Sequence, residues 1–319
     1  MNVRINCSEL SEAQKSALAD HVENLVSQLQ SKAGVDISTL NEVVIPDDFD
    51  AELIAFQESH DILERGRTND DSGLAVCKVV KYKESGQIIQ TVFLDEDVWL
   101  SMLFSPEKAD CDMAIHLLHH ELAHVQDSQH QQDLFSANFT SPHINDLSVV
   151  LRKLARNTWG EYYASRTSGG TMPLEHACGL SGLYETVDYV LSKVQSLIDS
   201  CRYDGDIEGL WNKSEELCWR FMYVIGSSLG YFHYNASYFA EESEIIEDVE
   251  KKVGDSLGKL EPVWTGASSA LNALFNTYPN WTGVEDLDEL SEVILKAFNV
   301  MGLFPRQEGE GIYVDVPIK

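Results

Sequence analysis

The chain has 319 residues, of which 44% are hydrophobic, so it can bury a large core and form more than one domain. Its formal net charge of −29 argues against nucleic acid or an anionic membrane as a primary ligand, because both are themselves negative. No stretch has the length and apolar purity of a membrane span. The first residues lack the apolar core of a secretory signal, and the six cysteines form no CxxC pair, so we expect reduced thiols and a cytoplasmic protein.

The first third of the chain alternates between helical and β-branched patterns. Apolar residues at helical spacing are followed by a glycine, and two segments rich in β-branched residues flank a Glu-Ser-Gly turn. These patterns predict a helix over 11–33 that ends at Gly34, a short strand over 43–46, a helix over 47–59, and a β-hairpin with strands over 74–82 and 87–94.

The next segment contains an HExxH motif. On a helix, His120 and His124 stand one turn apart on one face and can share a metal ion. Glu121 stands beside them, where it can take a proton from a metal-bound water. At 100° per residue, an apolar stripe falls on nearly the opposite side of the helix. The pattern predicts a helix over about 110–128, capped by Asp110 or Asp112, with Ile115, Leu118, Leu122 and Val125 in its apolar stripe.

Two histidines and a water leave room for a third protein ligand. The best candidate is Glu161, which continues the apolar stripe of a predicted helix made by Leu147, Val150, Leu151, Leu154 and Thr158. A carboxylate on a core-facing stripe is costly unless it is paired or bound to a metal. The alternative is a structural ion pair of Glu161 with Arg156 or Arg166.

An HExxH motif followed by a glutamate on a second helix resembles the gluzincin branch of zinc metallopeptidases. The string Trp159-x-Glu161-Tyr162-x-Ala164-x-Arg166 also resembles compact bacterial and prophage-type zincin domains, and the resemblance covers roughly residues 74–170. It implies that His120, His124 and Glu161 hold Zn²⁺ and that Glu121 is the general base. Ser165 departs from the acidic residue that many thermolysin-like enzymes carry at this position, so a ligand imidazole would need support from elsewhere.

A rival ligand set lies in the same string. Residues 120–130 match the metzincin spacing HExxHxxGxxH, with His130 as the third ligand and Asp127 in place of the glycine. Aspartate adopts the φ > 0 conformation of that glycine less readily. Met172 would then be the methionine turn. If the helix instead continues past Asp127, this side chain is either solvated or an acceptor for a ligand imidazole. His116 and His119 are interpreted as neighbours of the site or as solvated residues.

Two kinds of substrate contact are expected, one from a strand and one from oxyanion donors. By analogy with zincins, the strand at Thr91–Leu94 would line the cleft and bind an extended peptide by strand addition. Tyr231 and His233 are candidate donors to the oxyanion of the transition state, with Tyr234, Tyr163 and Arg166 as alternatives.

The second half of the chain is predicted to be mostly helical, with helices over about 174–200, 207–232, 237–253, 257–276 and 286–300 and a final strand within 309–316. We therefore expect an α+β fold, with a zincin-like core and a mainly helical C-terminal portion. The expected division is an N-terminal region with the hairpin (1–105), a zinc-binding helical core (106–235) and a C-terminal helical region (236–319).

The expected function is zinc-dependent hydrolysis of peptide bonds in a peptide or protein substrate. A second hypothesis is a non-catalytic interaction or sensor protein that uses the metal for structure, which a fourth protein ligand such as His116 or Asp127 would favour. A third is a regulated protease of a bacterial stress or anti-phage system, which would have a regulatory protein partner.

Overall fold

The computed structural model divides the chain into two compact units. The first contains Met1–Gln132 and Thr167–Glu175, and the second contains Asp133–Arg166 and His176–Lys319. This division differs from the three consecutive regions expected from the sequence. No helix in the described part of the chain is both long and apolar enough to cross a membrane. The structure describes residues 1–62, 66, 69–70, 73–131, 146–173, 182–238 and 243–317.

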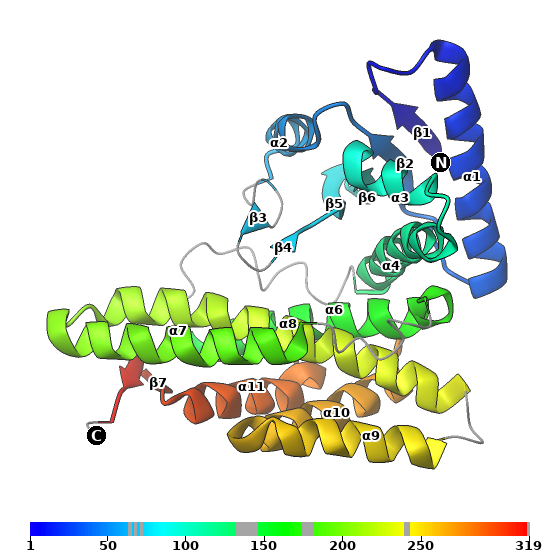
Figure 1. Cartoon of the computed structure of the whole chain (residues 1–319). Helices are drawn as coiled ribbons and strands as arrows, with labels where there is room; N and C mark the ends of the chain where they lie inside the picture. The colour runs from blue at the N-terminus through cyan, green and yellow to red at the C-terminus, as the bar shows by residue number, and fades with distance from the viewer. Residues whose placement is uncertain are drawn as a thin grey trace. The chain divides into compact units, whose positions relative to one another are not determined.

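The first unit contains a four-stranded mixed sheet (Figure 1). Its strands are β1 (Asn2–Ile5), β2 (Leu40–Ile45), β6 (Gln87–Leu94) and β5 (Cys77–Glu84), in that order across the sheet. The first three are parallel, and β5 pairs with β6 in the antiparallel direction. The sheet therefore has two edges, β1 and β5. β3 (Asn69–Asp70) and β4 (Gly73–Leu74) pair in the antiparallel direction in a separate two-stranded sheet.

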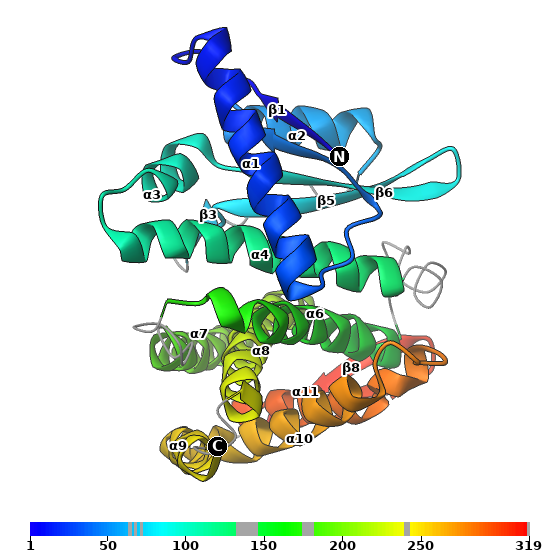
Figure 2. The same ribbon diagram turned by 90° about the vertical axis from the view of Figure 1, so that its right-hand side faces the viewer.

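Helices cover both faces of this sheet. Alternate strand residues point to opposite faces. Val43 and Val92 pack with α1 (Glu12–Ala33) and α4 (Lys108–His130) on one face, whereas Val44 and Phe93 pack with α2 (Phe49–Ser59) on the other. Figure 2 shows α1 crossing in front of the strands. A π-helical turn (Glu96–Leu100) and α3 (Ser101–Leu103) connect β6 to α4.

Local signals in the sequence explain the ends of several elements. Ser11 caps α1 in a reciprocal capping box with Gln14, and Gly34 ends the helix with φ of 71°. The hairpin turns at Ser85 and Gly86, which have φ of 51° and 82°. Two successive residues with positive φ are typical of the tight turns that match the twist of paired strands. The predicted helix, strand, helix and hairpin are all present.

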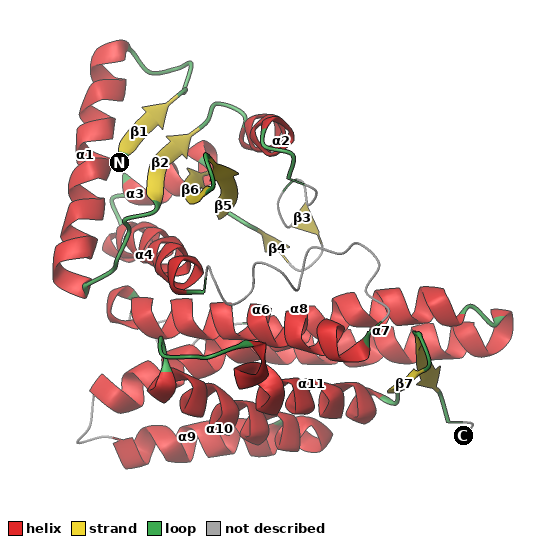
Figure 3. Cartoon of the chain, turned by 180° about the vertical axis from the view of Figure 1, so that it is seen from behind, coloured by secondary structure: helices red, strands yellow, loops and turns green. Residues whose placement is uncertain are grey.

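The second unit is a group of helices with a small hairpin at the C-terminal end (Figure 3). The first part of the helix predicted over 174–200 lies outside the described residues, and the strand over Phe304–Glu308 was not predicted. The elements are α6 (Leu147–Ser168), whose last two residues belong to the first unit, α7 (Leu183–Asp204), α8 (Ile207–Tyr238), α9 (Ser243–Ser256), α10 (Glu261–Thr277), α11 (Asp288–Met301), β7 (Phe304–Glu308) and β8 (Gly311–Asp315).

Helices α6 and α8 approach each other closely enough to require glycine. A Cβ atom on Gly226 would lie 2.5 Å from the carbonyl oxygen of Thr158, and one on Gly230 would lie 2.6 Å from that of Tyr162. Both distances are shorter than any ordinary contact of a Cβ atom. The two glycines are four residues apart, so they lie on one face of α8 and let the backbones of the two helices touch.

Candidate metal centre

Helix α4 carries the HExxH motif and begins earlier than predicted. Its N-cap is Glu107, whose side chain makes no capping hydrogen bond, so the predicted cap at Asp110 or Asp112 is wrong. Asp110 lies in the first turn and accepts a hydrogen bond from Ser105 Oγ at 2.7 Å. Asp112 instead pairs with Lys108 along the helix. A carboxylate in the first turn still favours the helix, because it faces the positive end of the helix dipole.

The two faces of α4 are those that the sequence predicts. Leu118, Leu122 and Val125 are fully buried in the core beneath the sheet, with Ile115 packed against them. The histidines of the motif lie on another face and are partly buried. The apolar stripe therefore fixes the rotation of α4.

His120 and His124 point their ring nitrogens at a common position. Their Nε2 atoms are 3.2 Å apart, and the rings are nearly perpendicular, with an interplanar angle of 80°. Two imidazoles bound to one tetrahedral zinc ion at the usual 2.0–2.1 Å would have nitrogens ~3.3 Å apart. The spacing in this helix thus fits two ligands of a single ion.

Glu161 supplies the third ligand atom of the group. One ligand atom each from His120, His124 and Glu161 all lie within 4.8 Å of one another, and the three side chains are partly buried. Two imidazoles and a carboxylate are a donor set found in catalytic zinc sites. The predicted stripe of α6 is buried as expected, from Leu147 to Thr158, and Glu161 follows it by one turn.

Glu121 is partly buried and lies near the beginning of β5. Burial raises the pKa of Cys77, the first residue of β5, and the negative charges of Glu121 and Asp95 raise it further. The carboxylate of Glu121 is therefore within electrostatic reach of this strand. Since β5 is an edge of the sheet, its outer side pairs with no strand in the described part of the chain.

The predicted role of Thr91–Leu94 is wrong. These residues belong to β6, which pairs with β2 on one side and β5 on the other, and Thr91 is fully buried. An interior strand has no free main-chain groups for a peptide to pair with. The hairpin was predicted correctly, but the order of its strands in the sheet was not readable from local pattern.

His116 and His119 are buried, so the interpretation of solvated residues is wrong. Their Nδ1 atoms lie 3.2 Å and 3.0 Å from the hydroxyl of Thr171, which donates to the carbonyl of Ser168 at 2.8 Å. The Thr171 oxygen therefore accepts from the histidines. Burial lowers the pKa of His116 to about 3 and that of His119 to about 4, and nearby imidazoles add to the effect. Both rings are thus neutral at neutral pH.

The metzincin-like alternative does not fit the helix. α4 continues through Asp127 to His130, so the chain does not turn back after the motif. At 100° per residue, His130 lies about 120° around the helix from His124. Asp127 is buried and accepts a hydrogen bond from Gln131 Nε2 at 2.8 Å, so it is not solvated. Among the described residues, neither belongs to the three-ligand group, and Met172 follows a short 3₁₀ turn in extended conformation.

The predicted oxyanion donors both lie on α8 and are buried. Tyr231 packs within the second unit. His233 has partners on both ring nitrogens: Nδ1 lies 2.7 Å from the hydroxyl of Tyr162, and Nε2 lies 3.1 Å from that of Ser268. No ring N–H of His233 is then left for a substrate oxygen. Donation by Tyr231 stays a prediction.

The alternative donors Tyr163 and Arg166 are held within the second unit as well. Tyr163 is buried, with its ring 4.8 Å from that of Tyr278. Arg166 donates to Tyr162 and to Asn272, and its guanidinium carbon lies 3.8 Å from the ring centre of Phe275. Tyr234, the last alternative, stacks on Tyr238.

The polar contacts that connect α6 to its neighbouring helices were not predicted from the sequence. Tyr162 and Arg166 are one helical turn apart, and this spacing could have predicted that their side chains interact. Tyr162 also contacts His233, which contacts Ser268, and Ser268 in turn contacts Glu250. Ser268 and Glu250 lie about 100 residues from α6 along the chain, and no spacing rule connects them to it.

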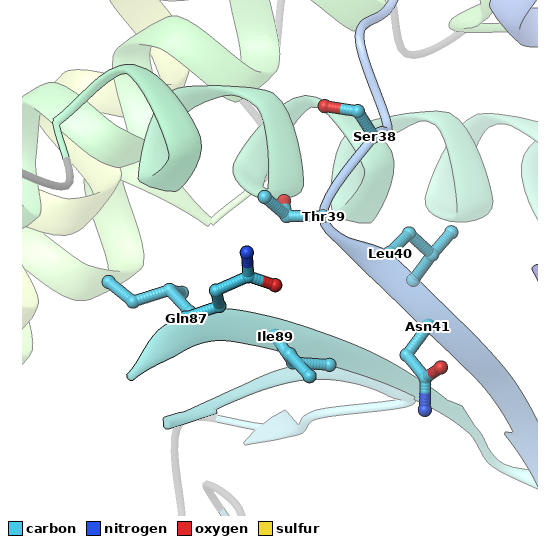
Figure 4. Close-up of a pocket in the computed structure, with 7 residues that line it drawn as sticks. Ser38, Thr39, Leu40, Asn41, Gln87 and Ile89 are labelled. Atoms are coloured by element: carbon cyan, nitrogen blue, oxygen red, sulfur yellow. The ribbon is translucent and has the colours of Figure 1, made fainter. Parts of the chain in front are cut away.

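A separate pocket lies where β2 and β6 begin (Figure 4). Its lining has no titratable or metal-binding side chain, so it does not offer the chemistry of the HExxH group. The lining residues are Ser38, Thr39, Leu40, Asn41, Gln87, Ile88 and Ile89.

The chain as a whole matches no family model, no curated protein and no solved structure.

Proposed function

We propose that the protein is a zinc-dependent hydrolase of peptide bonds with a zincin-like core. The observation that carries this proposal is the grouping of His120, His124 and Glu161 within 4.8 Å, with Glu121 next to the first ligand. A chance HExxH motif would not be expected to have a carboxylate from a second helix beside both of its histidines.

The residues of the group have distinct roles in this proposal. When bound, a zinc ion lowers the pKa of a coordinated water and polarises a carbonyl group. His120, His124 and Glu161 would hold the ion. Glu121 would take the proton of the attacking water and return it to the nitrogen that leaves, as a general base and then a general acid. Glu121 directly follows His120, about 100° further around the helix, and it is not a member of the three-ligand group.

The number of ligands favours catalysis over a structural role for the metal. Structural zinc sites usually have four protein ligands, whereas catalytic sites have three and leave one position open. In the described part of the chain, the group has three members, and the candidates for a fourth, His116 and Asp127, do not belong to it. The non-catalytic hypothesis therefore has less support than the enzyme.

The substrate in this proposal is an extended peptide that pairs with the outer edge of β5, along which no strand of the described part of the chain lies. Main-chain hydrogen bonds to an edge strand recognise a peptide of any sequence. β5 is the edge strand whose first residue, Cys77, lies near Glu121. This assignment replaces the interior strand β6.

Elemental analysis of the purified protein tests the proposal directly. Wild type should contain close to one zinc per chain after zinc is supplied and excess is removed. Glu161→Ala should lose most of the metal, and the control His130→Ala should keep it, because His130 lies on the same helix as the two histidine ligands but outside the three-ligand group. Loss only in His130→Ala would favour the metzincin-like set, and wild type without zinc would overturn the proposal.

A further inference from the structure

A continuous chain of polar side chains runs through the second unit from α6 to α9. Arg166 Nη1 contacts the hydroxyl of Tyr162, which lies 2.7 Å from His233 Nδ1. His233 Nε2 lies 3.1 Å from Ser268 Oγ, which lies 2.5 Å from Glu250 Oε1. Tyr162 is fully buried, and His233 is 9% exposed. The chain connects four helices, namely α6, α8, α10 and α9.

The two ends of this chain fix the direction of every hydrogen bond in it. A guanidinium group can only donate, and an ionised carboxylate can only accept. Arg166 therefore donates to the Tyr162 oxygen, and the Tyr162 hydroxyl donates to Nδ1 of His233. Because Nδ1 accepts, the ring donates from Nε2 to Ser268, and Ser268 donates to Glu250.

The ionisation of the chain's members agrees with this direction. Burial raises the pKa of Tyr162 well above its ordinary value, so the phenol keeps the proton that it donates. Burial would also raise the pKa of Glu250, but the imidazole of His233, whose Nε2 lies 3.7 Å from Oε1, and the hydrogen bond from Ser268 outweigh it, and the pKa is lowered. Glu250 is therefore a carboxylate at neutral pH.

The chain acts on the part of α6 that carries Glu161. Tyr162 is the next residue, and Arg166 is one turn further on the same helix. The same turns lie against Gly226 and Gly230 of α8, and Ser165 Oγ lies 2.9 Å from Ser227 Oγ. Backbone contact sets the distance between α6 and α8. The hydrogen-bonded chain sets the rotation of α6 about its own axis and its position along that axis.

We propose that Tyr162, His233, Ser268 and Glu250 are positioning residues: together with Arg166 they form one hydrogen-bonded chain of fixed direction that holds Glu161 in place to bind the metal. This inference rests on the proposed function. In this inference, His233 helps to position α6, the helix that carries Glu161, and does not donate to the substrate. Groups that orient metal ligands are typically worth 10- to 100-fold in metal affinity.

The direction of the chain can be tested in metal-free protein. Nitrogen NMR of protein labelled with ¹⁵N-histidine, with His233→Gln used to assign the resonance, reports which ring nitrogen carries the proton. Wild type should show the neutral ring protonated on Nε2. Ser268→Ala should disturb that state, since it removes the acceptor, and Ser268→Thr should restore it. A wild-type ring protonated on Nδ1, or one that exchanges freely between both forms, would overturn the chain.

The positioning role is tested by zinc affinity, measured by competition with a chromogenic chelator. Ser268→Ala and Tyr162→Phe should each raise the dissociation constant about 10-fold or more, and Ser268→Thr should stay near wild type. The matched control is Ser291→Ala, because Ser291 is a buried serine on α11 that donates only to the Leu287 carbonyl. It should lower stability without changing the affinity.

The outcomes separate this inference from the proposed function. When Ser268→Ala and Tyr162→Phe are combined, the dissociation constant for zinc should rise by less than the product of the two single increases. Either substitution alone already interrupts the hydrogen-bonded chain. Unchanged affinity in Ser268→Ala and Tyr162→Phe, with zinc still bound by wild type, would overturn the positioning role alone. Wild type that binds no zinc would overturn both.

Discussion

Substitution of Glu121 should remove proton transfer, whereas substitution of its neighbours should remove metal binding. His120 and Glu161 would hold the metal, so their alanine variants should lose zinc. Glu121→Gln keeps the shape of the side chain but cannot take a proton. We expect it to retain wild-type zinc content and to lose at least 100-fold in the rate of hydrolysis of fluorescein-labelled casein.

The control for this prediction is Glu107→Gln at the start of the same helix, which removes a carboxylate outside the ligand group. It should cleave casein at the wild-type rate. A Glu121→Gln protein that cleaves as fast as wild type would exclude Glu121 as the general base.

His116 makes the stability of the metal-free protein depend on pH. Burial is the main reason that its pKa is lowered from the ordinary value of 6.5 to about 3 in the folded protein. Between these pH values the unfolded chain binds a proton that the folded protein does not. The free energy of unfolding therefore has its full value above about pH 6.5 and falls as the pH is lowered toward 3. His116→Asn should weaken this dependence.

Urea unfolding at pH 7, 6 and 5, with a chelator present, measures the effect. The free energy of unfolding should fall less steeply between pH 7 and 5 in His116→Asn than in wild type. His21→Gln is the control, because His21 is exposed on α1. Equal slopes for all three proteins would contradict the prediction.

At the scale of single residues, the sequence was informative where chemistry follows from spacing. HExxH on a helix predicts that two histidines share a face, and the apolar stripe of α6 points to Glu161. The burial of His116 was not predictable, because its partner Thr171 lies on a different element. Nor was the support of Glu161 by Ser268 and Glu250, which depends on how α9 and α10 pack.

Gly230 is the element-scale feature that most limits substitution. Ala would bring a Cβ to 2.6 Å from the Tyr162 carbonyl oxygen and 2.8 Å from Ser165 Cβ. Alanine favours a helix by about 1 kcal/mol over glycine, but overpacking of this kind costs about 1–3 kcal/mol. We expect Gly230→Ala to be destabilised in thermal unfolding.

Gly266→Ala in α10 provides the comparison. There the added Cβ would meet only a side-chain methyl of Val293, at 3.1 Å, which can move by a few tenths of an ångström. Its melting temperature should therefore stay near that of wild type. If the two alanine variants have equal melting temperatures, the close approach of α6 and α8 does not limit stability.

Elements with strong local signals were predicted, and those that depend on distant partners were not. Ser11 and Gly34 define the two ends of α1, and the hairpin turn defines β5 and β6. β1 has only four residues and contains Asn2 and Arg4, so it does not look like a buried strand by itself. It forms because residues of β2, far along the chain, provide the parallel partner.

For the molecule as a whole, zinc should act as a stabilising ligand. A ligand that binds only the folded state at about 100 times its dissociation constant stabilises that state by about 2.7 kcal/mol. We expect added zinc to raise the melting temperature by several degrees and a chelator to reverse the change. Glu161→Ala should respond much less than wild type. The same shift in Glu161→Ala and wild type would mean that zinc stabilises the protein elsewhere.

The strand order of the first unit has a consequence for how the site comes into existence during synthesis. Within the four-stranded sheet, β5 and β6 are paired through a short turn, whereas β2 must wait for β6, which is made after α2 and β5. Pairing of strands that are distant in sequence is slow, because a long loop must close first. α4 is made later still and needs the finished sheet beneath its apolar face. The helix alone places the two imidazoles one turn apart, but the sheet must hold α4 in place, and Glu161 follows on the later helix α6. A nascent chain would therefore bind the proposed metal only after its sheet has assembled.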